Sequence, residues 1–146
     1  MATSDPDLID VVAGPIDVAG LQGAVRRNSS GAVASFVGVV RDEHQGVRVH
    51  HLVYEAYPPM AQREMRRIAA EARAQWPIDA IALVHRVGRL EIGEASVAIV
   101  VAAPHRREAL EACAFAIEKL KREVPIWKKE YSADGAAWVI GDPSRS

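Results

Sequence analysis

The chain lacks most of the features that mark a secreted, membrane or metal-dependent protein. Cys113 is the single cysteine among 146 residues, so no disulfide can form within the chain, and we expect a cytoplasmic location. No apolar run approaches the roughly 20 residues that span a bilayer, and the polar, acidic residues 1–6 do not follow the pattern of a signal peptide. Because no spaced set of cysteines and histidines is present, no metal site is predicted.

The chain also lacks a strong net charge and the motifs of the common nucleotide-dependent enzymes. Its formal net charge is −1 at pH 7, whereas domains that bind nucleic acid are usually basic. There is no glycine-rich dinucleotide fingerprint, no phosphate-binding P-loop and no G-x-S-x-G nucleophile motif. Nucleotide-dependent and serine-hydrolase activities are therefore without support, and no cofactor is predicted.

The composition is that of an ordinary globular protein, with 49% hydrophobic and 25% charged residues. We expect a single domain over residues 1–146, with loose tails at 1–6 and 141–146. Apolar runs bounded by glycine and proline predict strands at residues 8–13, 31–40, 47–55, 78–87, 95–103, 126–131 and 137–140. Capping and periodicity signals predict helices at residues 17–27, 58–76 and 104–123.

Further patterns predict how these elements pack. Residues 31–40 are apolar almost throughout, which predicts a strand buried on nearly both faces, and the loop after them favours antiparallel pairing with residues 47–55. On the last helix, a 3.6-residue stripe is predicted to be buried, namely Leu110, Cys113, Ala114, Ile117 and Leu120. Because helices mix with mainly hairpin-linked strands, the predicted fold class is α+β.

Positive charge is concentrated in residues 119–130, which hold five cations and two anions. Pro125 divides this segment, so Lys121 is expected near the end of a helix and Lys128 on the strand that follows. Two amines at one mouth can bind an anion, or can transfer protons if burial or mutual repulsion lowers a pKa. The alternative is a solvated surface, because lysines in the last turn of any helix favour its negative end.

Two further cationic positions are candidates for anion binding. His105, Arg106 and Arg107 stand at the predicted start of the last helix, where free N–H groups attract anions. Arginine opposes the helix dipole there, so it needs another reason to be present. Arg41 ends the apolar run 31–40, and side chains at strand ends often point into clefts.

Five stretches of the chain, taken in order, resemble one known family. They are F-V-G-V-V-R at 36–41, L-V-Y-E-A-Y-P-P-M-A at 52–61, H-R-V-G at 85–88, H-R at 105–106 and L-K-R-E-V-P-I-W-K-K-E at 120–130. Each stretch is weak evidence, but their unbroken order between residues 8 and 139 is specific. The chain resembles the large, catalytic subunit of molybdopterin synthase, the MoaE family.

The resemblance implies an α/β hammerhead fold with an additional antiparallel β subdomain. It also implies a sulfurtransferase that acts in molybdenum cofactor biosynthesis and needs neither metal nor cofactor. The sulfur donor would be the C-terminal Gly-Gly thiocarboxylate of a small ubiquitin-like partner subunit. The acceptor would be cyclic pyranopterin monophosphate, which becomes the dithiolene of molybdopterin. The implied assembly is a homodimer with a small subunit at each end, a heterotetramer.

The same resemblance assigns roles to individual residues. Lys121 and Lys128 would be the catalytic lysines. The residues implied to bind substrate or line its pocket are Val39, Val40, Arg41, His105, Arg106, Lys129 and Glu130. Two other functions stay open: a non-catalytic adaptor that binds an anionic Gly-Gly peptide tail, and, less favoured by the net charge, a single-stranded RNA binder that uses Trp127 and Tyr131.

The length of the last helix constrains how these residues can meet. Arg106 and Lys121 are fifteen residues apart, which is about 22 Å along a straight helix. A pterin monophosphate is much smaller than that distance. We therefore expect a composite site in a dimer, with Lys121 and Lys128 from one subunit and His105 and Arg106 from its mate.

Overall fold

The chain folds into two sheets and three helices in a computed structural model, which describes residues 7–139. The elements are β1 (Asp7–Val12), α1 (Val18–Val25), β2 (Ala32–Val39), β3 (Glu43–His44), β4 (Val47–Ala56), α2 (Pro58–Gln75), β5 (Ala80–Arg86), β6 (Gly88–Glu91), β7 (Ala95–Ala103), α3 (Arg106–Glu123), β8 (Ile126–Ser132) and β9 (Gly135–Val139). The predicted α+β class is confirmed. The predicted tails, and residue 140 of the last predicted strand, lie outside the described residues.

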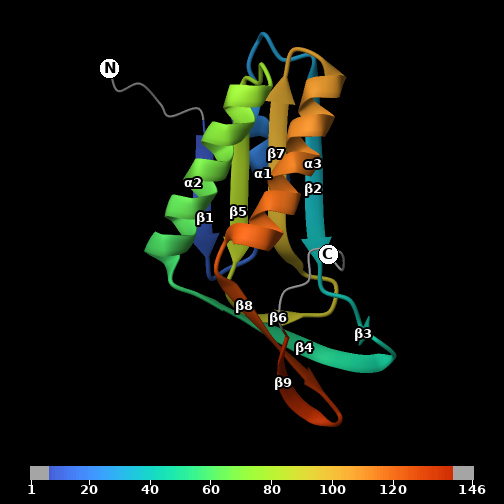
Figure 1. Cartoon of the computed structure of the whole chain (residues 1–146). Coiled ribbons are helices and arrows are strands. Elements are labelled where there is room, and N and C mark those ends of the chain that lie inside the picture. The colour runs from blue at the N-terminus through green and yellow to red at the C-terminus, as the bar shows by residue number, and fades with distance from the viewer. Residues whose placement is uncertain (1–6, 140–146) are drawn as a thin grey trace.

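The first sheet carries the main core. Its strand order is β1-β5-β7-β2, with β1 parallel to β5 and the other pairs antiparallel. Helices α2 and α3 cover one face, and α1 covers the other (Figure 1). Large side chains such as Ile81 and Leu83 face α2 and α3, while Ala80 and Ala82 face α1. This alternation follows the two-residue period of a strand, so β5 is buried on both faces.

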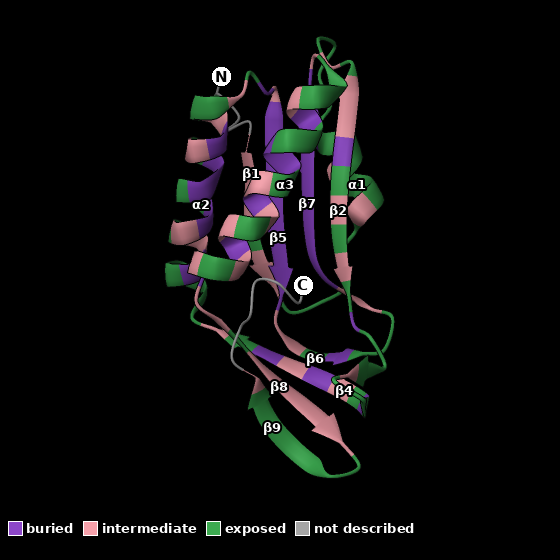
Figure 2. Cartoon of the chain, turned by 45° about the vertical axis from the view of Figure 1, so that its right-hand side comes forward, coloured by how far each residue is buried: buried purple, intermediate pink, exposed green. Residues whose placement is uncertain are grey.

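The second sheet lies beyond one end of the first (Figure 1). Its order is β3-β4-β8-β9, and β6 pairs with β4 as well. A small cluster of Val40, Val49, Leu52, Tyr54 and Leu90 forms its core. Burial falls outward from this cluster, and β9 is exposed along most of its length (Figure 2). Because β4 leads into α2 and β8 follows α3, both long helices connect the two sheets.

Two predictions about β2 are wrong. It is an edge strand of the first sheet, partly exposed, and it pairs with β7 rather than with β4. The loop after it forms its own hairpin, in which β3 pairs with β4 across Gln45 (φ 53°) and Gly46 (φ 82°). Positive φ at both positions suits a tight two-residue turn, so that turn cannot join β2 to β4.

The helix boundaries and the buried stripe also differ from expectation. Helix α1 ends at Val25, and α3 begins at Arg106 with His105 as its N-cap, so Pro104 precedes the helix instead of opening it. The buried residues of α3 are Ala109, Ala112, Cys113, Ala116 and Leu120, whereas Leu110 is 60% exposed and Ala114 is exposed. The buried face of α3 is therefore made mostly of small side chains, and Leu110 lies outside it.

Candidate functional site

A pocket of about 300 Å³ lies where the two sheets and the end of α3 meet. Its lining comes from β2 and the loop after it, from β3, β4 and β7, and from the junction of α3 with β8. The lining residues are Phe36, Val37, Gly38, Val39, Arg41, Glu43, His44, Leu52, Tyr54, Ser96, Lys121, Lys128 and Glu130. Segments far apart in the chain therefore bring three cations, Arg41, Lys121 and Lys128, to one cavity.

The break between α3 and β8 places the two lysines. Pro125 follows the C-cap of α3, and β8 begins at Ile126, so Lys121 occupies the last turn of the helix and Lys128 the third position of the strand. In the register with β4, Lys128 pairs with Tyr54 and Glu130 pairs with Leu52. Because side chains alternate along a strand, Lys128 and Glu130 share the face that lines the pocket.

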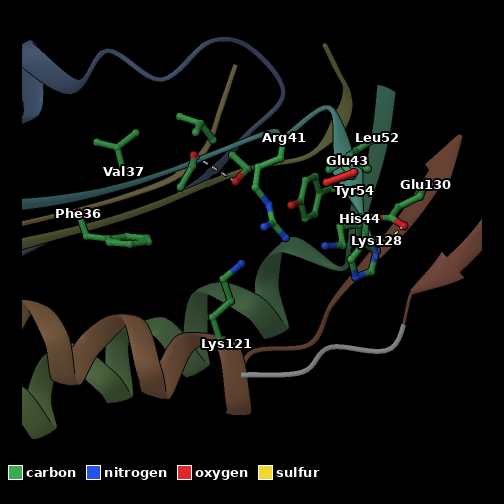
Figure 3. A pocket seen from close by; sticks show the side chains of 13 residues that line it. Phe36, Val37, Arg41, Glu43, His44, Leu52, Tyr54, Lys121, Lys128 and Glu130 are labelled. Carbon is green, nitrogen blue, oxygen red and sulfur yellow. Dashed lines mark hydrogen bonds and ion pairs between the residues drawn. The ribbon is translucent and has the colours of Figure 1, made fainter. Parts of the chain in front are cut away.

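Arg41 is placed by its neighbour Val40. The Val40 N–H donates to the Glu94 carbonyl (3.0 Å), and the Val40 carbonyl accepts from the Gly93 N–H (2.8 Å). Val40 itself is 3% exposed and belongs to the core of the second sheet. With Val40 fixed, Arg41 extends into the pocket toward Lys121 (Figure 3).

Lys121 is the lysine whose surroundings favour proton transfer. Partial burial, and then the charge of Lys128, lower the pKa of its ammonium below the usual 10.5. Desolvation and a like charge both disfavour the protonated form. A lysine of this kind releases a proton more readily near neutral pH than one in water, and it regains charge when an anion enters.

Tyr54 lines the pocket beside the cations and His85 packs behind it, and sequence reasoning assigned neither to the site. Burial raises the pKa of the Tyr54 phenol, against the opposing effect of a hydrogen bond with Ser96. His85 packs edge-on against Tyr54, with ring centroids 5.0 Å apart. Burial lowers the pKa of His85 to about 4, and its Nδ1 lies 2.8 Å from the Arg86 carbonyl. At neutral pH, Tyr54 therefore keeps its hydroxyl proton and His85 is uncharged.

A bonded pair lies at the pocket's edge, in which Glu130 was expected from the family resemblance and His44 was not. His44 Nδ1 and Glu130 Oε1 are 2.7 Å apart, and the two side chains are 13% and 16% exposed (Figure 3). The signal for His44 was weak, since it stands in a polar loop that carries no motif.

Four of the residues named by the family resemblance do not line this pocket. Val40 is in the core, as described above. Lys129 lies on the opposite face of β8, with its ammonium 5.5 Å from the ring centre of Tyr131 and 5.3 Å from that of Trp138. His105 and Arg106 are exposed at the start of α3, the far end of the helix from Lys121. The pocket thus brings together Val39, Arg41, Lys121, Lys128 and Glu130.

Other chemical possibilities find little support in the described part of the chain. Within residues 7–139, no group of three metal-ligating side chains is close enough to hold an ion. Cys113 is buried, and burial raises its thiol pKa to about 11, which suits the core thiol that its place on α3 implies. None of the described helices combines the length and the apolar character that crossing a membrane requires.

Comparison with known proteins gives consistent matches. The model of the MoaE family, described as MoaE protein, matches residues 11–123. A molybdopterin synthase catalytic subunit from Pyrococcus abyssi is 47% identical over 118 residues, which cover 81% of this chain and 80% of that protein. One from Bacillus subtilis is 44% identical over 133 residues, covering 91% and 84%. The crystal structure of molybdopterin synthase from Staphylococcus aureus superposes with a TM-score of 0.88 at 37% identity, covering 94% of this chain and 99% of that one.

Proposed function

The chain belongs to the MoaE family of molybdopterin synthase catalytic subunits, and on that premise we propose that it is a sulfurtransferase. The sulfur donor is the C-terminal thiocarboxylate of a small ubiquitin-like partner subunit. The acceptor is cyclic pyranopterin monophosphate, and the product carries the dithiolene of molybdopterin. The protein works in the cytoplasm, as one domain that forms a homodimer and, with the small subunits, a heterotetramer.

The observation that carries this proposal is the convergence of Arg41, Lys121 and Lys128 on one pocket. Both substrates carry a negative charge: the pterin has a phosphate that can anchor it, and the partner's tail ends in the thiocarboxylate that reacts. Cationic side chains held in a partly desolvated pocket stabilise such groups and the charge that develops between them. Transfer of each sulfur also consumes a water, whose oxygen replaces the sulfur on the tail and leaves a carboxylate.

The geometry suggests a division of labour in the pocket. Arg41, whose guanidinium offers a fork of donors, suits the phosphate. Lys121, with its lowered pKa, accepts and returns protons at the reacting carbon. Lys128 stabilises the thiocarboxylate and the carboxylate that replaces it after transfer. Tyr54 supplies a neutral hydroxyl donor beside them.

His105 and Arg106 enter this proposal through the dimer. Helix α3 has 18 residues, so its ends are about 27 Å apart. Arg106 of one subunit therefore cannot serve the pocket of the same subunit, and we assign it, with His105, to the site of the dimer mate. Their exposure at a helix N-terminus, together with the positive charge of Arg106, supports an anion-binding role there.

The rival function is an adaptor that holds the partner's tail without chemistry. The catalytic function is favoured because the matched relatives are named catalytic subunits. An adaptor would also gain nothing from a lysine whose charge is disfavoured by burial. A partner tail would bind an ordinary solvated lysine equally well.

The deciding experiment incubates the purified protein with cyclic pyranopterin monophosphate and a thiocarboxylated small subunit. Dithiolene formation is then assayed, with the same small subunit ending in a plain carboxylate as the control. The proposal expects dithiolene only with the thiocarboxylate. An adaptor would bind both forms of the tail and yield no dithiolene with either.

A further inference from the structure

The pocket has two walls that come from distant parts of the chain. One wall is the segment after β2, which carries Arg41 and His44. The other is β8, which carries Lys128 and Glu130. The side-chain bond between His44 and Glu130 joins these walls across 86 residues of sequence. An anionic ligand that touches both Arg41 and Lys128 must fit the separation that this bond helps to set.

The two walls differ in how firmly the backbone holds them. Strand β8 lies between β4 and β9, with ladder partners on both sides. The opposite wall is held over a shorter stretch: its two-residue strand, β3, pairs with β4 at Val47 and Arg48, and the Asp42 carbonyl before it accepts from the Val49 N–H (2.8 Å). Its hairpin turn is exposed. A short edge hairpin of this kind opens readily unless side chains secure it.

The bond between His44 and Glu130 is suited to that task. Both side chains are largely withdrawn from solvent, at 13% and 16% exposed, so water competes weakly for the bond. By contrast, the other ion pair of this hairpin, between Arg48 and Asp42, is 3.8 Å long and joins side chains that are 77% and 63% exposed. Such exposed pairs contribute little.

Resting on the proposed function, we infer that His44 is a positioning residue for the sulfur-transfer site. Through Glu130 it holds the segment that bears Arg41 against the strand that bears Lys128. Together with the backbone bonds of Val40 and Asp42, it thereby sets the distance between the two cations that the anionic substrate meets. His44 itself does not take part in proton or sulfur transfer.

Two substitutions of His44 separate this role from simple packing. His44→Asn keeps an N–H donor close to the position of Nδ1 but removes the bulk of the ring, whereas His44→Leu keeps the bulk and removes the donor. We expect His44→Leu to raise KM for the pterin substrate about tenfold, as loss of one hydrogen bond to a carboxylate would. The same variant should change kcat little, and His44→Asn should stay within about twofold of wild type. Arg48→Ala, in the same hairpin, is the matched control and should leave KM unchanged.

The opposite ranking, with His44→Asn impaired and His44→Leu intact, would assign His44 to packing and overturn the inference. Equal KM values for all variants would overturn it too. Imidazole ¹⁵N shifts give a readout that does not depend on sulfur transfer: the His44 signal should move in Glu130→Gln if the bond exists in solution. An unmoved signal would likewise overturn the inference. If the wild-type protein forms no dithiolene, the proposed function is wrong. That result can be told apart from a failure of the His44 inference, because the ¹⁵N shifts still report whether His44 bonds Glu130.

Discussion

The two ends of α3 carry the same kind of charge in opposite surroundings. At the start of the helix, His105 and Arg106 are exposed. At its end, Lys121 lies in a pocket with a second lysine, and burial lowers its pKa. The end is also tied down: Glu123 accepts from Arg67 of α2 (2.7 Å) and from Lys119 (2.9 Å). One terminus is therefore exposed to solvent, and the other lines a pocket.

We propose that one helix serves the reaction at both ends, each end in a different active site of the dimer. A charge that only has to meet a phosphate can stay solvated, because attraction to an anion does not require burial. A group that must exchange protons near neutral pH needs a shifted pKa, and burial beside a like charge supplies the shift. In this proposal, the length of the helix keeps the solvated anion-binding groups apart from the buried lysine that exchanges protons.

The largest expected effect falls on Lys121. Lys121→Ala should reduce sulfur transfer by about 10³-fold or more, in the upper range for loss of a general acid–base group. Lys121→Arg is the sharper control, because arginine keeps the charge but does not release a proton. If charge alone mattered, Lys121→Arg would retain activity. We expect both variants to be inactive in the dithiolene assay while remaining folded, as cooperative thermal unfolding would verify.

A hybrid dimer tests whether the two ends of α3 serve different sites. One chain carries Arg106→Ala and the other Lys121→Ala, and differently tagged subunits allow the hybrid to be purified. In a composite arrangement the hybrid contains one intact site and one doubly damaged site, so activity should rise well above that of either mutant homodimer. If both groups act within one subunit, the hybrid has no intact site. Activity as low as that of the parents, in a dimer verified by light scattering, would contradict the composite site.

Substitutions of Lys128 and Lys129 test which face of β8 contributes to the pocket at the C-terminal end of α3. Lys128 lines the pocket, whereas Lys129 lies over Tyr131 and Trp138 on the other face. Lys128→Ala should lower kcat/KM about 100-fold, because it removes a charge that stabilises the transition state. Lys129→Ala should lower it only about threefold, as a change outside the site would. Equal losses would point to a diffuse electrostatic role for the whole segment.

Local sequence signals predicted much of this arrangement. Pro125 placed Lys121 at a helix end and Lys128 on a strand. The pairing of β2 was wrong because the loop after it contains enough turn signal for a hairpin but does not say which strands the hairpin joins. The turn joins the short strand β3 to β4, and β4 also pairs with β8 in the second sheet.

The neutral and paired members of the pocket could not be predicted in the same way. Tyr54, His85 and Ser96 act through contacts between segments more than ten residues apart, and a sequence period does not report such contacts. His44 and Glu130 are 86 residues apart, so their bond becomes visible only once β8 is placed against β4. Charge patterning found Lys121 and Lys128 because both lie in one short cationic segment, and Arg41 was found from its place at a strand end. Neither signal identifies the groups that orient these cations.

The smallest expected effect concerns stability, and it compares the two ends directly. Lys121→Met removes a charge that burial disfavours, while Arg106→Met removes an exposed one. In the folded state the pKa of Lys121 lies below its ordinary value of 10.5, so between those two pH values the unfolded chain binds more protons and wild-type stability rises with pH. At neutral pH the wild type therefore bears the full cost of burying this charge.

Lys121→Met should then raise Tm by a few degrees, the shift that about 1 kcal/mol produces in a domain of this size. That advantage should shrink as the pH approaches 10.5, where Lys121 is losing its charge in both states. Arg106→Met should leave Tm unchanged at every pH. Thermal melts of the wild type, Lys121→Met and Arg106→Met between pH 7 and 10.5 measure these changes in Tm. An equal rise in Tm from both substitutions would mean that the two ends of α3 do not differ in burial.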